Sequence, residues 1–130
     1  MNAIKQGLWI FVLFLTIISF SAVSRAESYA CDALYNQIMQ PGFDDADAGR
    51  RTAACYESVV DDEAEDKSNQ AEVYYRIGVA RYFVAASSGD ITEMVKSRDA
   101  LQKAVELDPD HAAARDQLMK AEGWINPKGK

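Results

Sequence analysis

The chain has 130 residues, a length that suits a single domain. Its formal net charge at pH 7 is −6, from 14 basic and 20 acidic residues. This sign argues against nucleic acid or an anionic membrane as the binding surface, so we expect no nucleic-acid partner.

The first 26 residues have the three parts of a secretory signal peptide. Lys5 precedes an apolar run from Leu8 to Phe20, and small residues follow, ending at Ala26. This order predicts export with cleavage after Ala26. The apolar run is shorter than the roughly 20 residues that span a bilayer. We therefore expect a periplasmic or secreted protein with no membrane span after cleavage; an uncleaved anchor at residues 8–23 is the alternative.

Cleavage would leave a domain over residues 27–123 and a C-terminal tail over residues 124–130. The net charge would become −8, because the lost segment carries two basic residues and no acidic one. All of this net charge lies in residues 27–67, an acidic region that can steer a basic partner.

Two cysteines lie in segments that share one apolar spacing. The spacing is that of a buried helical stripe, first at Cys31, Leu34, Tyr35, Ile38 and Met39, then at Thr52, Cys55, Tyr56, Val59 and Val60. If a turn between antiparallel helices centres near Phe43, each cysteine lies 12 residues from it and both reach the same height. In an oxidising compartment this predicts a Cys31–Cys55 disulfide; two buried free thiols are the alternative.

The third and fourth helices are predicted from caps at both ends. Asn69 with Glu72 predicts the start of the third helix, and Gly89 predicts its end. Asp90 with Glu93 predicts the start of the fourth. The expected apolar stripes are Val73, Tyr74, Ile77, Ala80, Arg81 and Val84, then Ile91, Met94, Val95, Arg98, Leu101, Ala104 and Val105.

A fifth helix is predicted directly after the fourth. Asp108 suits its cap, Pro109 its first position and Asp110 its positive dipole end, and it ends near Gly123. Its thin apolar face is Ala114, Leu118 and Ala121. Because no segment alternates like a strand, we expect an all-α fold.

The third and fourth predicted helices resemble a tetratricopeptide repeat. That family repeats a helix–turn–helix of about 34 residues. The matching positions are Tyr74, Ile77 and Gly78 in the first helix, with Arg81 in the slot of a tyrosine, and Ser97, Leu101, Ala104 and Pro109 in the second. The spacing from Gly78 to Pro109 is longer than the family's by about two helical turns.

The resemblance covers about residues 29–123 and implies two antiparallel helical hairpins plus a C-terminal capping helix, a fragment of an α-solenoid. Gly78 and Ala104 are expected to be small because the two helices of a hairpin cross closely there. The first helix of each hairpin lines the family's peptide-binding surface. This implies a partner-binding groove formed by Asn36, Gln40, Glu72, Tyr75, Val79 and Tyr82. Packing of Tyr75 and Tyr82 under the fifth helix or against the first hairpin is the alternative.

The sequence contains no convincing catalytic or metal-binding set. His111, the only histidine, falls in the first turn of the fifth helix, and we expect it to be solvated there. The stretch DDADAG, from Asp44 to Gly49, lacks the offsets of a calcium loop and suits turn and cap roles. We therefore expect a protein that is not an enzyme and that needs no cofactor or metal.

Together these features favour an exported, non-catalytic adaptor that binds a protein or peptide segment, in envelope assembly or secretion. The alternative is a structural subunit of an envelope complex that forms homo-oligomers through its first helix. The short array motivates this alternative, because each hairpin buries its apolar face only against a neighbour.

Overall fold

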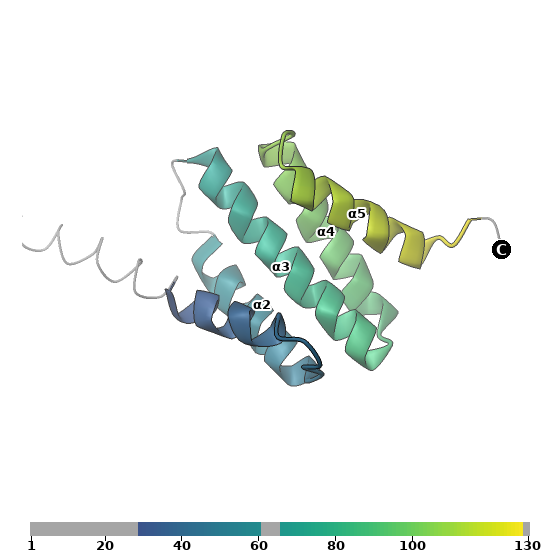
Figure 1. Ribbon diagram of the computed structural model, residues 1–130. Helices are drawn as coiled ribbons and strands as arrows, with labels where there is room; N and C mark the ends of the chain where they lie inside the picture. The colour runs from purple at the N-terminus through teal and green to yellow at the C-terminus, as the bar shows by residue number, and fades with distance from the viewer. Residues whose placement is uncertain (1–28, 61–65, 129–130) are drawn as a thin grey trace, which may run out of the picture.

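The computed structural model describes residues 29–60 and 66–128 (Figure 1). The predicted signal peptide, its cleavage site and the alternative anchor lie outside the described residues. The described residues form helices and no strand, which confirms the all-α expectation. The helices are residues 29–38, α2 (Ala46–Val60), α3 (Lys67–Ser88), α4 (Ile91–Leu107) and α5 (Ala112–Ile125). None of them is long and apolar enough to cross a membrane.

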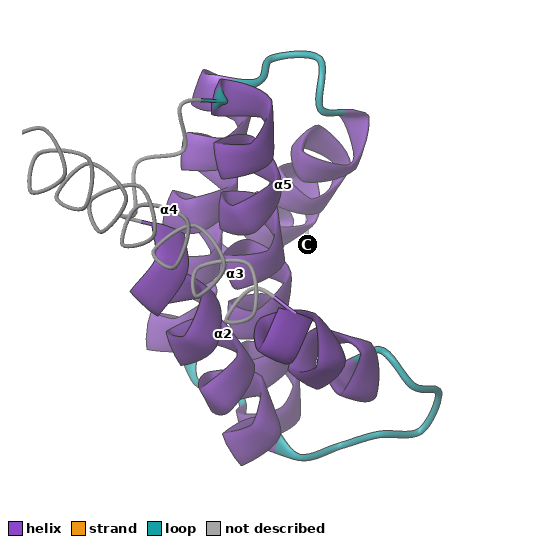
Figure 2. Ribbon diagram, turned by 90° about the vertical axis from the view of Figure 1, so that its left-hand side faces the viewer, coloured by secondary structure: helices purple, strands orange, loops and turns teal. Residues whose placement is uncertain are grey.

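The helices lie in two layers. Figure 1 shows residues 29–38, α3 and α5 on the viewer's side, the front layer, with α2 and α4 behind them as the back layer. In Figure 2 the segment 29–38 and α5 lie on the same side of α3. Along the chain α2 packs on α3, α3 on α4 and α4 on α5, and α3 also touches α5. Among α2 to α5, each helix therefore contacts mainly its neighbours in sequence, while the segment 29–38 contacts both α2 and α3.

Only the C-terminal end of α3 lies where the sequence predicts it. The cap is Asp66, whose side chain accepts a hydrogen bond from the Ser68 amide, so α3 begins before the expected cap Asn69. Gly89 ends the helix with a positive φ of 74°, as expected. The helix starts after Asp66 rather than after Asn69, because the Asp66 carboxylate is a strong cap and the residues that follow, Lys67 to Gln70, are compatible with a helix.

The start of α4 confirms one half of the expected capping box. The Asp90 side chain accepts a hydrogen bond from the Thr92 amide at 2.8 Å. Glu93 does not complete the box, because its carboxylate binds Arg81 and Lys96 instead. A buried charge partner thus outweighs the local backbone bond that the motif offers.

The N-cap of α5 lies three residues later in the chain than predicted. Asp108 is the C-cap of α4 rather than the N-cap of α5. Pro109 lies in the turn that follows, and His111 caps α5 through a hydrogen bond from the Ala114 amide. Proline disfavours helical backbone in the residue before it, which explains why α4 ends here. The helix α5 continues past Gly123 to Ile125, because Ile125 packs against the core.

The predicted stripe residues are buried or half-buried, with two exceptions at helix ends. Met39 is 54% exposed and follows the last helical residue of the first segment, and Ile91 is 50% exposed as the first residue of α4. Helix α3 buries residues on more than one side, because it packs against both α2 and α4.

A disulfide joins Cys31 to Cys55, as predicted from their matching heights. The two Cα atoms are 5.5 Å apart, within the range that a disulfide requires. Cys31 is fully buried in a cluster with Tyr56, Val60 and Ile77. The bond therefore ties the segment 29–38 to α2 beside the core of the first hairpin.

Two glycines allow the helices to cross closely. A Cβ placed on Gly78 would lie 2.7 Å from Cδ2 of Leu101, which confirms the predicted close crossing of α3 and α4. The neighbour is Leu101, not the expected Ala104. A Cβ placed on Gly49 would lie 2.7 Å from Cγ2 of Val84, so α2 and α3 cross closely at a position that sequence analysis did not single out.

Candidate functional site

The predicted partner-binding residues lie on the front layer, and we call this surface the tyrosine face. It comprises Asn36, Gln40, Glu72, Tyr75, Val79 and Tyr82 together with the half-buried Tyr35. Asn36 and Gln40 are exposed, and the Gln40 amide donates a hydrogen bond to the Asn36 carbonyl oxygen at 3.3 Å. Val79 is only 9% exposed. The surface is therefore open at Asn36 and Gln40 and, apart from the buried Val79, half-exposed along α3.

Tyr75 and Tyr82 belong partly to the core. Both pack against the cluster of Ala85, Met94, Leu101 and Ala121, which α3, α4 and α5 build together. This matches the alternative placement under the fifth helix. Each ring also remains partly exposed, so both residues keep one edge at the surface. Tyrosine suits this position, because its ring is apolar and its hydroxyl is polar.

A polar network centred on Arg76 connects the segment 29–38, α2 and α3. The Tyr56 hydroxyl donates a 2.6 Å hydrogen bond to Asp32, and Arg76 donates to Asp32 and to the Tyr56 hydroxyl oxygen. The guanidinium also lies over the Tyr35 and Tyr56 rings, 5.3 and 5.8 Å from their centroids. A guanidinium over aromatic rings gains cation–π attraction in addition to its hydrogen bonds.

The same network extends to the start of α5. The Arg76 Nε donates to Glu72 at 3.0 Å, and the other Glu72 oxygen lies 2.9 Å from Nε2 of His111. Because the Ala114 amide donates to Nδ1 of His111, that nitrogen is an acceptor and Nε2 carries the proton. The Tyr75 ring lies 4.9 Å from the imidazole. His111 is 14% exposed, so the expectation that it is solvated was wrong.

Burial raises the pKa of two tyrosine hydroxyls in this network. Burial and the hydrogen bond to Asp32 raise the pKa of Tyr56 to about 12. Burial and the nearby Tyr75 hydroxyl likewise raise the pKa of Tyr35. A neutral phenol can donate a hydrogen bond, which the contact between Tyr56 and Asp32 requires. Both tyrosines are therefore hydrogen-bonding groups at neutral pH rather than bases.

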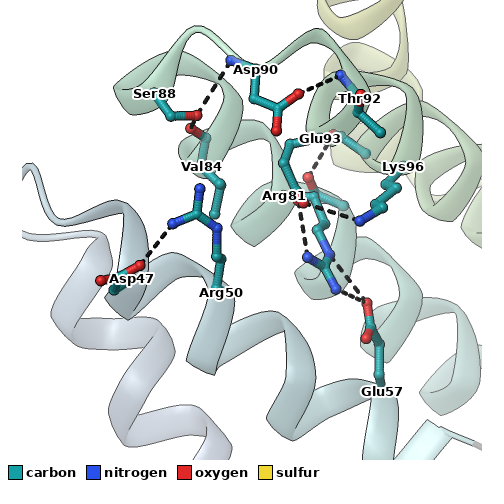
Figure 3. A network of polar contacts seen from close by, with 12 residues as sticks. Asp47, Arg50, Glu57, Arg81, Val84, Ser88, Asp90, Thr92, Glu93 and Lys96 are labelled. Carbon is teal, nitrogen blue, oxygen red and sulfur yellow. Dashed lines mark hydrogen bonds and ion pairs between the residues drawn. The ribbon is translucent and has the colours of Figure 1, made fainter.

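A second network, shown in Figure 3, is centred on Arg81 and connects α2, α3 and α4. Arg81 donates to Glu57 of α2 at 2.7 Å and to Glu93 of α4 at 2.9 Å, and Lys96 also binds Glu93. Arg81 and Glu93 are 13% and 8% exposed. Arg81 takes the place of a family tyrosine in the predicted repeat, and here it joins α3 to both of its neighbours.

The described residues contain no cluster of three or more histidine, cysteine or acidic side chains placed to hold a metal ion. Asp45 of the DDADAG stretch accepts hydrogen bonds from the amides of Asp47 and Ala48, which is the predicted cap role. Both nitrogens of His111 are engaged in hydrogen bonds, so its ring belongs to the polar network around Arg76 and Glu72.

Sequence analysis missed the network around Arg76. Its members Asp32 and His111 are far apart in the chain and carry no shared motif. The only feature of the sequence that could indicate these contacts is the place of each residue beside a core position: Asp32 follows the buried Cys31, and Arg76 precedes the buried Ile77. Neither position identifies a partner, because the contacts span 44 and 39 residues.

The comparisons with known proteins identify no relative. The chain matches no protein-family model and no curated protein. It also matches no solved structure.

Proposed function

We propose that this chain is an exported, non-catalytic adaptor of the tetratricopeptide type that binds a protein segment on its tyrosine face. The observation that carries the proposal is the position of this face. It spans the segment 29–40 and α3, and Figure 1 shows the helix 29–38 and α3 in the front layer; Tyr35, Tyr75 and Tyr82 are partly exposed there, and Asn36 and Gln40 are exposed. Large, rigid and half-polar tyrosine side chains are enriched where proteins bind each other.

The resemblance to tetratricopeptide repeats is supported by packing as well as by motif. Gly78 and Leu101 occupy the matched positions and touch, and helices contact mainly their sequence neighbours. Stacked helical hairpins have this pattern, because each unit contacts only the next. The expected export agrees with the disulfide, since such bonds persist in oxidising compartments.

The charge of the tyrosine face suits a partner segment with a basic residue. Glu72 of this face and Asp32 next to it keep 43% and 36% of their side chains exposed; Arg76 pairs with both, and His111 contacts Glu72. Opposite charges across an interface accelerate encounter and select the partner. We therefore expect a segment that places an apolar or aromatic side chain against the tyrosines and a basic one near Glu72.

The test begins with crosslinking of the full-length protein in its native fraction and mass spectrometry of captured proteins without reducing agent. Capture of one recurrent protein is then compared in variants. Asn36→Arg and Gln40→Arg change exposed side chains of the tyrosine face, and Ala54→Arg on the exposed side of α2 is the matched control. We expect the first two to reduce capture and the control to retain it. Equal capture by all three would exclude the tyrosine face.

The second candidate is a structural subunit that self-associates through the segment 29–38. The observation in its favour is the exposure of Tyr29 and Met39, at 74% and 54%. Capture of only the chain itself, lost with Tyr29→Arg or Met39→Arg, would favour this candidate over the adaptor.

A further inference from the structure

The outer side of α5 carries an exposed apolar residue beside an open glycine. Met119 is 66% exposed there, and a Cβ placed on Gly123 would meet no heavy atom within 4 Å. Ala114 and Ala121, on the opposite side of the helix, are fully buried. Exposed charged side chains surround Met119 and Gly123 on the outer side, so this face combines a small apolar contact with a charged border.

The same face repeats the spacing of a helix crossing found inside the molecule. On α3, Gly78 follows the large residue Tyr74 by four positions, and α4 packs closely there through Leu101. On α5, Gly123 follows Met119 by the same four positions, with no described helix above it. A glycine flanked by a large residue one turn away lets a second helix approach closely.

A hollow lies beside this face. Its volume is about 680 Å³, and it lies between the middle of α4 and the C-terminal part of α5. It is lined by Arg98, Met119, Glu122, Gly123, Asn126, Pro127 and Lys128. The lining combines apolar groups with charges of both signs, so it suits an occupant with the same mixture.

The sign of the charge on α5 changes across Met119, because a basic residue precedes it and an acidic residue follows it. Arg115 lies four residues before Met119 and Glu122 three after it, which places them about 6 and 4.5 Å along the axis on either side. Neither of these two charged side chains forms an ion pair with another of the described residues.

We propose that two copies of this chain associate through the outer face of α5, antiparallel about a two-fold axis near Met119. In this arrangement Arg115 of each copy faces Glu122 of the other. A two-fold axis requires a self-complementary surface, and the order of these charges meets that requirement. The N-terminal half of one α5 then occupies the hollow beside the C-terminal half of the other.

The dimer is reversible and independent of partner binding on the tyrosine face. One helix pair covers less than the roughly 800 Å² per partner of a standard interface, so we expect a monomer–dimer equilibrium. The proposed surface also differs from the segment 29–38, through which the second candidate function would act. Substitutions on α5 therefore separate the two.

The test is sedimentation velocity of the full chain, produced through a secretory route, over a series of concentrations. Arg115→Glu and Glu122→Arg each place like charges opposite each other twice in the dimer. We expect each to raise the dissociation constant about tenfold or more, and the double variant to return it close to the parent value. Lys103→Glu changes an exposed lysine of α4 and is the matched control.

A second measurement tests whether the two-fold axis of the dimer passes near Met119. Met119→Cys should crosslink to itself with a short bismaleimide, because the native cysteines are joined in a disulfide and do not react. Ser58→Cys on α2 should not crosslink. A monomer at all concentrations, a dimer insensitive to both charge reversals, or Met119→Cys that fails to crosslink would each overturn the proposal.

Discussion

Leu101 of α4 lies directly over Gly78 of α3, where the two helices cross. A Cβ placed on Gly78 would lie 2.7 Å from Cδ2 of Leu101, and Leu101 is fully buried. The Ser97 hydroxyl donates a 2.6 Å hydrogen bond to the Gly78 carbonyl oxygen at the same point. The absence of a side chain at Gly78 thus sets the distance between the helices.

Replacing Gly78 with alanine should therefore destabilise the fold. The added methyl group would push against Leu101, and we expect a loss of about 1–3 kcal/mol in unfolding free energy, although alanine favours helices. Urea denaturation measures this loss. The control is Gly123→Ala, which adds a methyl group in open space and should gain up to about 1 kcal/mol at concentrations where the chain is monomeric. Unchanged stability in Gly78→Ala would mean that α4 can move away.

Removal of the disulfide should destabilise the first hairpin. The bond closes a loop between residues 24 apart in sequence. Its loss, in the double variant with Cys31→Ser and Cys55→Ser, should lower the unfolding free energy by about 3 kcal/mol in the chain-entropy model. Hydrogen exchange should rise first in residues 29–38, which the bond ties to α2. Exchange that rises equally in all helices would show that the hairpin is not a separate unit.

Because of the ion pair between Arg81 and Glu93, the free energy of unfolding should fall as the pH becomes acidic. Burial alone would raise the pKa of Glu93, but hydrogen bonds from Lys96 and Arg81 outweigh it and lower the pKa below the usual value. A lowered folded-state pKa contributes stability above the unfolded value, about 4.3, and this contribution is lost as pH falls through the folded value.

We therefore expect Glu93→Gln to cost about 3 kcal/mol at neutral pH, because it leaves Arg81 without one buried partner. The difference between parent and variant should shrink as pH falls below about 4. Thermal unfolding across this pH range measures both effects. Glu106→Gln, an exposed residue of α4, is the matched control and should change neither. A constant difference at all pH values would argue that Glu93 acts by packing alone.

Tyr56 should contribute to stability in the alkaline range. Burial and the hydrogen bond to Asp32 raise its pKa to about 12. A raised folded-state pKa contributes stability that is full below the unfolded value, about 10, and is lost as pH rises through the folded value. Tyr56→Phe should weaken this pH dependence and cost about 1–2 kcal/mol at neutral pH. Tyr29→Phe, at a side chain 74% exposed, should retain the parent's alkaline slope.

Local sequence patterns predicted much of the fold, because the ends and the buried stripe of a helix depend on residues that are close to one another in the sequence. Asp90 and Gly89 were identified as helix ends from residue type alone, since a carboxylate accepts the first free amides and glycine adopts a positive φ. The Cys31–Cys55 disulfide followed from equal spacing about one turn. The start of α5 was missed, because Asp108 and His111 both suit a cap and only the turn at Pro109 decides between them.

By itself the sequence determined that the chain forms helices, most of their buried stripes and the disulfide, because these depend on period and spacing. The tight crossing at Gly78 was expected from the resemblance to a tetratricopeptide repeat. The tertiary structure alone decided which polar groups meet. The contacts of Arg76 with Asp32 and of Glu72 with His111 depend on how far each helix is rotated about its axis. It also placed Tyr75 and Tyr82 against α4 and α5, because whether a half-polar ring is surface or core depends on the helix that covers it.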